Sequence, residues 1–392
     1  MSRTLPEPSD DERAHSRRLE EHIRAEIAAH GPIAFSRWMA LCLYAPGLGY
    51  YSAGRTKFGA AGDFVTAPEL GALFARVVAR ALAPTLRALG AGADFVELGG
   101  GSGAFARDLL RELAALDALP RRYRVLEPSA ELRERQRARV RDELAADVAA
   151  RVEWIERPPD DAWDGVLFAN EVVDALPTTR FGVRGGEVYE EHVALDGGRF
   201  VRVDRPADAL VAGAVRHLER ALGAEFADGY RSEVLPQLPH WLAAVAAPLR
   251  RGVALFVDYG YARREYYLPE RRDGTLVGHY RHHALADPLR WPGLVDLSAF
   301  VDFTALAEAG VGAGFELVGY ASQAQFLLAS GLAELLEAAQ DLGDVERLRT
   351  TAEAKRLVLP GDMGERFQAI AFARGVDDAL PGLRAVDASR RL

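Results

Sequence analysis

A glycine-rich run between residues 97 and 103 is the pattern in this sequence with the clearest chemical use. The run reads Glu-Leu-Gly-Gly-Gly-Ser-Gly, follows an apolar stretch and precedes a helical pattern. Glycine lets the backbone turn sharply and approach a ligand without Cβ clashes, and the next helix presents free N–H groups. Gly99, Gly101 and Ala104 also satisfy the dinucleotide pattern G-x-G-x-x-G/A. The turn, with Gly103 closing it, therefore predicts a nucleotide-like cofactor and leaves its identity open.

Acidic and amide side chains near that turn favour S-adenosylmethionine over NAD. Glu97 ends the strand before the first glycine, where a carboxylate suits a cationic methionine group better than a pyrophosphate. Glu127 ends the next strand and can bind the ribose hydroxyls of either cofactor. Asn170 and Glu171 follow the fourth strand, at the edge where open sheets bind ligands. We expect S-adenosyl-L-methionine as cofactor and S-adenosyl-L-homocysteine as product. An NAD-dependent oxidoreductase, and a binding protein that assists assembly without turnover, remain as alternatives.

The acidic segment after the fourth strand bears on the methyl acceptor. Glu171 and Asp174 are three residues apart and could face the same way if a helical turn begins there. A pair of carboxylates can bind two guanidinium N–H groups and accept a proton, which is what methylation of an arginine requires. Asn170 can hydrogen-bond the acceptor nitrogen or the cofactor. Two plainer interpretations remain, with Asp174 capping a turn and Glu171 simply solvated.

Alternating strands and helices must position these residues. Strands predicted at 95–98, 123–127, 152–155, 165–169 and 253–258, with helices between the earlier ones, indicate a parallel sheet with crossover helices. Later strands at 315–320 and 367–373 permit the reversed final hairpin of class I methyltransferases. The predicted fold is α/β, a Rossmann-like seven-stranded class I methyltransferase sheet.

Three segments are expected around that core. Residues 1–90 form an N-terminal helical extension and a cofactor-covering loop, in which Thr66 and Glu69 have the spacing of a capping box. Residues 91–178 and 250–392 form the methyltransferase core, and 179–249 an inserted hairpin and helix region. The aromatic, histidine-rich connection 259–302 is long enough to be a functional loop.

Composition excludes several function classes. Cys42 is the only cysteine among 392 residues, so an intramolecular disulfide and a cysteine-based zinc site are impossible. A formal charge of -9 opposes binding to nucleic acid. No apolar run reaches the roughly 20 residues that cross a bilayer, so we expect a cytoplasmic protein without membrane insertion. The spacing of His279, His282, His283 and Asp287 matches no standard zinc pattern, so we expect no metal and a packing or substrate-binding role.

The motifs together resemble the MidA-like methyltransferases, whose mitochondrial members assist respiratory complex I assembly by dimethylating an arginine. The matches span nearly the whole chain and include Tyr44-x-Pro46-x-x-Gly49-Tyr50-Tyr51, Gly62-Asp63-Phe64-Val65-Thr66-x-Pro68-Glu69, Glu97-Leu98-Gly99-x-Gly101-x-Gly103, Glu127-Pro128-Ser129, Asn170-Glu171-x-x-Asp174-Ala175-Leu176-Pro177, Asp258-Tyr259-Gly260, Asp302-Phe303-Thr304 and Pro360-Gly361-x-Met363-Gly364.

The resemblance implies a protein substrate, methylation of an arginine, and a lid of Asp63 and Phe64, near Thr66, over the cofactor. Asp258, His282 and Asp302 are further candidates for substrate binding. Leu297-Ser298 stands where the family has an Ile-Thr-like pair, a conservative departure. No targeting presequence precedes the first helix, which suggests a bacterial member, so complex I assembly is not transferred as its role. A homodimer is possible.

Overall fold

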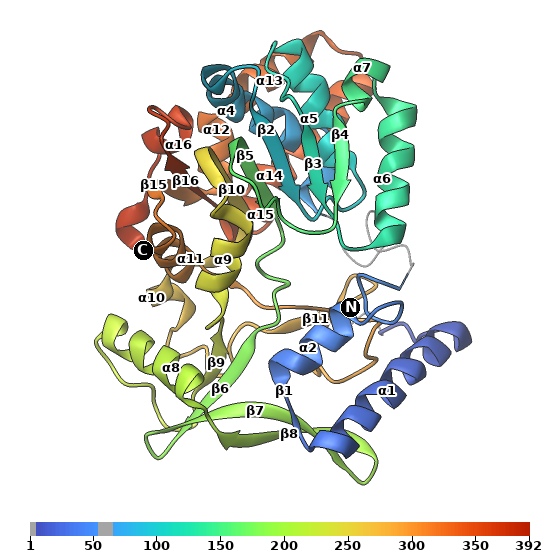
Figure 1. Ribbon diagram of the computed structural model, residues 1–392, viewed down its shortest axis with the longest axis vertical. Coiled ribbons are helices and arrows are strands. Elements are labelled where there is room, and N and C mark those ends of the chain that lie inside the picture. The colour runs from blue at the N-terminus through green and yellow to red at the C-terminus, as the bar shows by residue number, and fades with distance from the viewer. Residues whose placement is uncertain (1–4, 54–65) are drawn as a thin grey trace. The chain divides into compact units, whose positions relative to one another are not determined.

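A computed structural model describes residues 5–53 and 66–392 of the chain (Figure 1). Two compact units are present. Unit 1 comprises Met1–Phe64, Asp174–Gln237 and Arg263–Phe300, and unit 2 comprises Val65–Val173, Leu238–Ala262 and Val301–Leu392. These units divide the chain differently from the predicted segments, because the helix after residue 70 groups with the large sheet and most of the 259–302 connection groups with unit 1.

Unit 2 is built on an eight-stranded sheet within the described residues. Its main path runs β15-β16-β10-β5-β2-β3-β4, and β14 pairs with β10. Strands β4, β3, β2, β5 and β10 are parallel, whereas β16 is antiparallel to both β10 and β15. The reversed final hairpin and the α/β class I methyltransferase fold are thus confirmed. The strands are β2 (Asp94–Leu98), β3 (Tyr123–Leu126), β4 (Val152–Ile155), β5 (Trp163–Asn170), β10 (Leu249–Tyr261), β14 (Val301–Asp302), β15 (Glu316–Ser322) and β16 (Phe367–Arg374).

Strand β10 is buried on both faces, as its apolar run predicted. Val253, Leu255 and Val257 belong to the core shared with α4 and α5, while Phe256 points the other way and packs near Trp241 of α9. Because side chains alternate across a strand, these two sets mark the two faces of the sheet.

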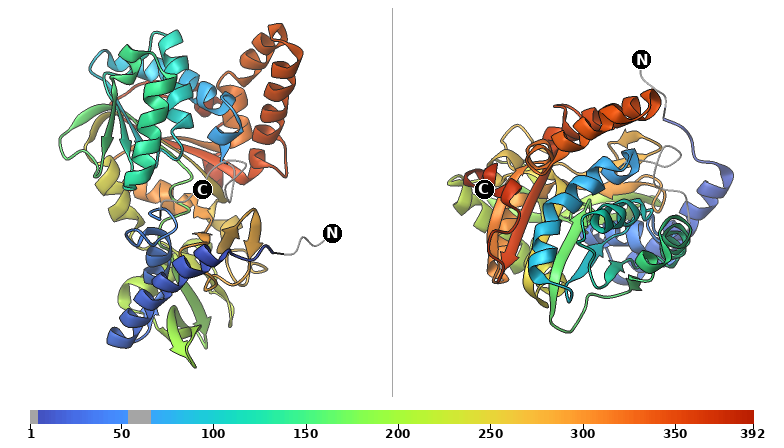
Figure 2. Two further views of the ribbon diagram at one scale, coloured as in Figure 1. Left: turned by 90° about the vertical axis from the view of Figure 1, so that its right-hand side faces the viewer. Right: turned by 90° about the horizontal axis from the view of Figure 1, so that it is seen from above.

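Helices cover both faces of that sheet (Figures 1 and 2). Helix α4 packs on α5, β5 and β10, whereas α9 packs on α11. Helix α14 packs on α4, α12 and α15. The helices of unit 2 are α3 (Ala67–Leu70), α4 (Leu73–Leu89), α5 (Ala104–Ala115), α6 (Ala130–Glu143), α7 (Ala146–Ala149), α9 (Leu238–Ala246), α11 (Phe303–Gly312), α12 (Gln323–Ala329), α13 (Leu332–Ala338), α14 (Asp344–Val358), α15 (Met363–Arg366) and α16 (Pro381–Ala385), with 3-10 turns η1 (Ala339–Asp341) and η2 (Ser389–Arg391).

Unit 1 contains a five-stranded antiparallel sheet in its described part. The order is β1-β7-β6-β9, with β8 paired to β7. These elements are α1 (Asp10–His30), β1 (Ile33–Ala34), α2 (Phe35–Tyr44), β6 (Thr179–Arg184), β7 (Glu187–Asp196), β8 (Arg199–Pro206), α8 (Ala209–Leu222) and β9 (Arg231–Val234). The predicted N-terminal helices and inserted hairpins are confirmed.

The connection predicted as a loop contains regular structure. It holds α10 (Arg263–Tyr266) and a three-stranded sheet of β11 (Val277–Tyr280), β12 (His283–Leu285) and β13 (Asp296–Ser298) in the order β12-β11-β13. Tyr280 and Leu297 from this sheet join a core with Trp38 and Cys42 of α2. Cys42 is 1% exposed, and burial raises the pKa of its thiol far above the usual range.

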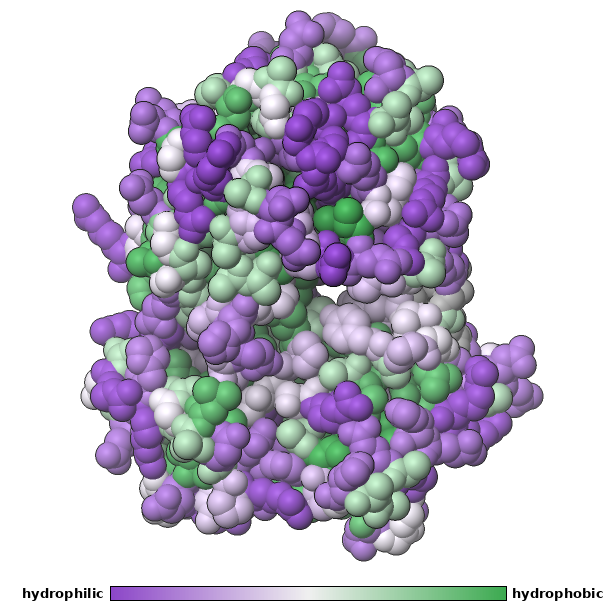
Figure 3. All heavy atoms as spheres, in the orientation of Figure 1, coloured by the Kyte–Doolittle hydropathy of each residue, from purple (hydrophilic) through white to green (hydrophobic). Residues whose placement is uncertain are grey.

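The outer surface is mostly polar on the face drawn in Figure 3, with apolar side chains in small separate groups. In the described chain, no helix combines the length and apolar character needed to span a membrane.

Candidate functional site

The glycine turn lies directly after β2, at the carboxyl edge of the parallel strands. Gly99, Gly101 and Gly103 have φ of 67°, 52° and 81°, and Gly103 is the N-cap of α5. A side chain at Gly101 or Gly103 would be strained in that left-handed conformation. A Cβ on Gly100 would stand 2.5 Å from a methyl carbon of Val125. The turn is therefore tightly packed against β3 and leads directly into the first residues of α5.

The side chain of Gln136 on α6 hydrogen-bonds the glycine turn. Its Nε2 donates to the Gly101 carbonyl at 2.9 Å and to Glu127 Oε2 at 3.3 Å, and its Oε1 accepts from Trp154 Nε1 at 2.8 Å. The side chain is 1% exposed. One buried amide thus joins the glycine turn, the acid that follows β3, and the indole of β4.

Glu69 and Arg139 both form hydrogen bonds with Ser102 of the same turn. The Ser102 hydroxyl donates to the Glu69 carboxylate, and Arg139 Nη1 donates to the Ser102 hydroxyl oxygen at 2.6 Å and to its carbonyl at 3.0 Å. The predicted capping box is wrong, because Thr66 makes no side-chain cap bond and Glu69 is bonded to Ser102 instead. Thr66 remains close to Glu69 only through its carbonyl, which accepts the Glu69 N–H.

Glu97 and Glu127 are both buried at this edge. Tyr123 donates its hydroxyl to Glu97 Oε2 at 2.8 Å, and burial raises the pKa of Glu97 to about 8. The nearby charge of Glu127 contributes to this rise, while the hydrogen bond from Tyr123 opposes it. Glu127 Oε1 accepts the N–H of Ser129 at 2.9 Å. Both acids are held beside the turn, and their contacts with the methionine and ribose ends of a cofactor stay predictions.

Asn170 and Glu171 end β5, the strand beside β2. Glu171 has a φ of 53°, which a residue with a side chain rarely adopts and which costs about 1–3 kcal/mol. Asn170 Nδ2 donates to Glu171 Oε1 at 3.0 Å, whereas the buried Asn170 Oδ1 has no hydrogen-bond partner in the described chain. A buried amide oxygen without a donor, next to a residue with a strained backbone, is typical of a place where a ligand completes the hydrogen bonding.

Asp258 fixes the backbone that follows Glu171. Its Oδ2 accepts the N–H groups of Val172 and Val173 at 3.2 and 3.0 Å, and its Oδ1 accepts that of Tyr259 at 2.9 Å. The Glu171 N–H itself donates to the Val257 carbonyl at 3.0 Å. Asp258 is 1% exposed, so these contacts make it a positioning residue for the Asn170–Glu171 pair.

Comparisons with known proteins agree with this geometry. The family described as "Putative S-adenosyl-L-methionine-dependent methyltransferase" matches residues 77–321, more than half of the chain. This chain belongs to that family. Its cofactor is S-adenosylmethionine and it is a methyltransferase, so the NAD alternative is no longer supported.

Solved and curated relatives extend the match over the whole methyltransferase. A likely methyl transferase from Burkholderia thailandensis, bound to S-adenosyl-homocysteine, has a TM-score of 0.91 and 42% identity, covering 99% of this chain and 100% of that one. The mitochondrial protein arginine methyltransferase NDUFAF7 homolog of Drosophila melanogaster is 29% identical and covers 95% of this chain and 88% of that protein. Human NDUFAF7 is 28% identical, covering 90% and 82%.

The residues of unit 2 fit the family's cofactor. The tight glycine turn, the buried acids Glu97 and Glu127, and the Asn170 oxygen without a partner meet at one edge of one sheet. When bound, S-adenosylmethionine supplies a methyl group activated by its sulfonium. The glycine turn and Glu127 would hold its adenosine part, and Glu97 and Asn170 its methionine part. The predicted lid residues Asp63 and Phe64 lie outside the described residues.

The other predicted acceptor residues are placed differently. The helical turn that would set Glu171 and Asp174 on the same side does not begin at Glu171, because positive φ at this residue and the bonds to Asp258 give the segment a bend. Helical spacing therefore gives no reason for the two carboxylates to face the same way. Asp174 belongs to unit 1, where it is 6% exposed and its carbonyl accepts the Ala299 N–H at 3.1 Å.

His282 and Asp302 have local structural roles. His282, with φ of 62°, lies with Arg281 in the turn between β11 and β12. Asp302 is the N-cap of α11 and accepts the Ala305 N–H at 3.1 Å. Over residues 5–53 and 66–392, no group of three or more His, Cys, Asp or Glu side chains could hold a metal ion.

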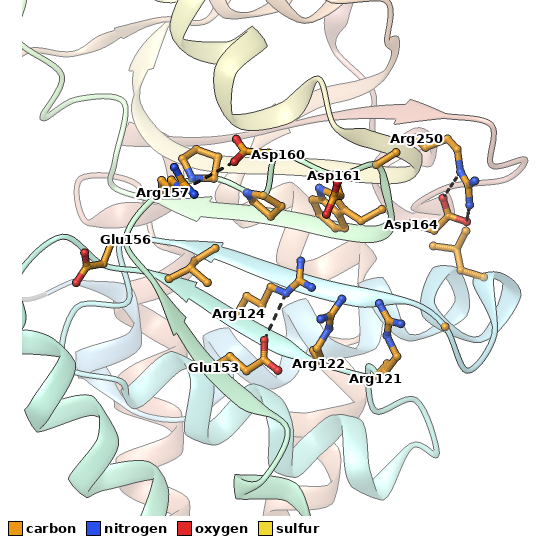
Figure 4. A pocket seen from close by; sticks show the side chains of 17 residues that line it. Arg121, Arg122, Arg124, Glu153, Glu156, Arg157, Asp160, Asp161, Asp164 and Arg250 are labelled. Carbon is orange, nitrogen blue, oxygen red and sulfur yellow. Dashed lines mark hydrogen bonds and ion pairs between the residues drawn. The ribbon is translucent and has the colours of Figure 1, made fainter.

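A groove of about 1070 Å³ lies near the opposite, amino ends of β3, β5 and β10 (Figure 4). Five arginines and five carboxylates line it, so it has no preference for a ligand of either charge. Several of these side chains pair locally. Arg250 binds Asp164 at 2.8 Å, and Arg121 and Arg122 bind the buried Asp94. The groove therefore does not contribute to the candidate site.

Three contributors to the site were not predicted from the sequence, namely Gln136, Ser102 and Arg139. A signal for Gln136 was present, because it occupies the buried stripe of α6 between Leu132 and Val140 at a spacing of four. A polar residue at such a position needs buried partners. No comparable local signal marks Arg139.

Proposed function

We propose that this methyltransferase modifies a guanidinium nitrogen of an arginine in a protein substrate. The observation that carries the proposal is the conformation of Glu171. Its backbone has a φ of 53° just after the carboxyl end of β5, and its carboxylate accepts a hydrogen bond from Asn170. Strain of this kind persists where surrounding contacts enforce it, and it is concentrated at active sites. The names of the relatives from Drosophila melanogaster and human support the same acceptor.

The chemistry of an arginine acceptor suits this acid. A guanidinium stays protonated near neutral pH and is a poor nucleophile until it is oriented and loses a proton. Glu171 can accept two of its N–H groups in a forked geometry and take up the proton that the methylated nitrogen releases. Asn170 Oδ1 can accept a further N–H from the acceptor or the cofactor. Asp174 remains a candidate for a second acceptor-binding acid.

A labelled-methyl assay tests the proposal. The full chain, S-adenosylmethionine with a labelled methyl group and proteins from a strain lacking this gene are incubated together, then hydrolysed to identify methylated amino acids. We expect label in methylarginine, with the rate falling about 10²–10⁴-fold in Glu171→Gln. Glu337→Gln, at an exposed position of α13, is the matched control and retains the wild-type rate.

Two results would overturn the proposal. Label in another amino acid would replace arginine as the acceptor while leaving the methyltransferase assignment in place. No transfer by the wild type, together with calorimetric binding of S-adenosylhomocysteine, would favour the alternative of a binding protein that assists assembly.

A further inference from the structure

The exposed apolar side chains of this methyltransferase are concentrated in one part of unit 2. Nine large hydrophobic residues are exposed in the described chain, and five of them lie between residues 328 and 359. Monomeric proteins seldom gather exposed apolar side chains in one place unless the place binds something. Four of these five residues lie in α14 or directly beside its two ends.

Helix α14 has apolar residues on two sides. On its packed side Ala354 and Leu357 are buried, and Glu353 accepts the Leu73 N–H at 2.7 Å, which attaches the helix to the start of α4. On the other side Val345 and Leu348 are 66% and 67% exposed. A helix that is apolar on two sides is normally buried on both.

The exposed residues form a continuous stripe. Val345, Leu348 and Ala352 follow one another at spacings that keep them on one side of the helix, Leu342 precedes the first turn, and Leu359 directly follows the last residue of α14. Leu359 is 45% exposed and Leu342 39%. We call Leu342, Val345, Leu348, Ala352 and Leu359 the α14 stripe. Figure 2 shows orange-red helical ribbon on the outside of unit 2 in both views, and the exposed fractions of Val345 and Leu348 show that the stripe is accessible to solvent.

The charges beside the stripe indicate what covers it. Asp344 is in the first turn and Lys355 in the last, eleven residues apart and therefore on nearly the same side of the helix. A second copy of α14 laid antiparallel on the stripe would bring Asp344 of each copy to Lys355 of the other. Such a two-fold arrangement places the same patch on both partners. Asp344 also pairs with Arg347 within its own helix at 2.7 Å, which leaves its second oxygen for an incoming lysine.

The same antiparallel register matches the apolar residues. With Asp344 opposite Lys355, position 348 of one copy lies opposite position 351 of the other, so Leu348 packs beside Ala352 of the second copy, a large side chain next to a small one. Opposite charge and complementary side-chain size thus both favour an antiparallel second copy of α14.

We propose that the α14 stripe is a homodimer interface in which two copies of α14 pack antiparallel about a two-fold axis near residue 350. The proposal does not depend on the identity of the methyl acceptor.

Sedimentation velocity of the full chain over micromolar to millimolar concentrations tests it. The wild type is expected to show a reversible monomer–dimer equilibrium. Leu348→Asp should weaken dimerisation at least about 100-fold, because it buries a charge in the apolar contact. Leu210→Asp is the control, since Leu210 on α8 of unit 1 is 62% exposed and outside the stripe.

A charge exchange tests the register. Asp344→Lys alone and Lys355→Asp alone should each weaken dimerisation about tenfold, because each places two like-charged pairs in the interface. An equimolar mixture of the two variants should regain wild-type affinity, since both pairs are then of opposite charge. Recovery on mixing cannot come from a folding defect.

Three outcomes would overturn the proposal. They are a wild type that stays monomeric at every concentration, equal dimerisation of Leu348→Asp and wild type, and a mixture of the charge variants that associates no better than its components.

Discussion

Arg180 in unit 1 and Gln136 in unit 2 are both almost completely buried, and each joins three partners, but the partners differ in kind. Arg180 binds Glu233, Glu191 and Asp273, three carboxylates. Gln136 binds a backbone carbonyl, an indole and one carboxylate. The arginine cluster ties β6 to its neighbours β7 and β9 within one sheet. The glutamine cluster ends on the glycine turn.

The difference separates two uses of a buried polar side chain. An arginine among carboxylates is costly to disturb, because removing it leaves buried charges without compensation. An amide offers directed donors and an acceptor at a much smaller desolvation cost. Stability should therefore depend most on Arg180, and cofactor geometry on Gln136.

Removing the arginine should have the largest effect. Arg180→Ala leaves Glu233 and Glu191 buried at 1% exposure each, so the free energy of unfolding should fall by about 3–5 kcal/mol in urea titrations. Arg184→Ala, which breaks the exposed pair with Asp204, should cost less than about 1 kcal/mol. Equal losses in the two variants would contradict a special role for the buried cluster. The folded fraction of Arg180→Ala should bind S-adenosylhomocysteine with wild-type affinity.

Replacing Gln136 should affect cofactor binding more than stability. Gln136→Met keeps the volume and removes the hydrogen bonds, so unfolding should cost only about 1–3 kcal/mol less than in the wild type. The dissociation constant of S-adenosylhomocysteine, measured by calorimetry, should rise about tenfold because the glycine turn loses its anchor. Gln340→Met, at an exposed position, should change neither quantity. Unchanged affinity in Gln136→Met would remove the distinction between the two clusters.

The pH dependence of stability tests whether the buried Glu97 side chain is protonated in the folded protein. Its pKa is raised by burial to about 8 from 4.5, so the folded state binds a proton that the unfolded state has lost between these values. The free energy of unfolding should therefore fall as pH rises from about 4.5 to 8, by up to about 1.4 kcal/mol per pH unit. Glu97→Gln should flatten that slope in urea titrations at several pH values. A slope unchanged by the substitution would show that Glu97 is ionised throughout.

Local patterns were sufficient to predict most of the fold. Apolar runs such as the one at 253–258 and the glycines after β2 predicted the strands and the turn, because burial on both faces and left-handed backbone leave clear marks in the sequence. Strands β11, β12 and β13 were missed, since three or four residues are too few to show an alternating pattern.

The site was harder to predict where it depends on distant contacts. Asp258 hydrogen-bonds the backbone after Glu171 from 85 residues away, and the segment forms a bend where local spacing alone would also have allowed a helical turn. Glu69 is bonded to Ser102, 33 residues along the chain, rather than to its neighbour Thr66. Capping rules consider only the nearest residues, so they assigned Glu69 the wrong partner.

The single thiol has a practical consequence. Because Cys42 is enclosed beside Trp38 and its thiol resists ionisation, reagents that attack thiolates should leave it unmodified in the native protein. A cysteine introduced at any exposed position would then be the one reactive site, without replacement of the natural residue. Spectroscopic labels placed in this way at chosen points of unit 1 and unit 2 could record the distance between the two units in solution, with the natural sequence otherwise intact.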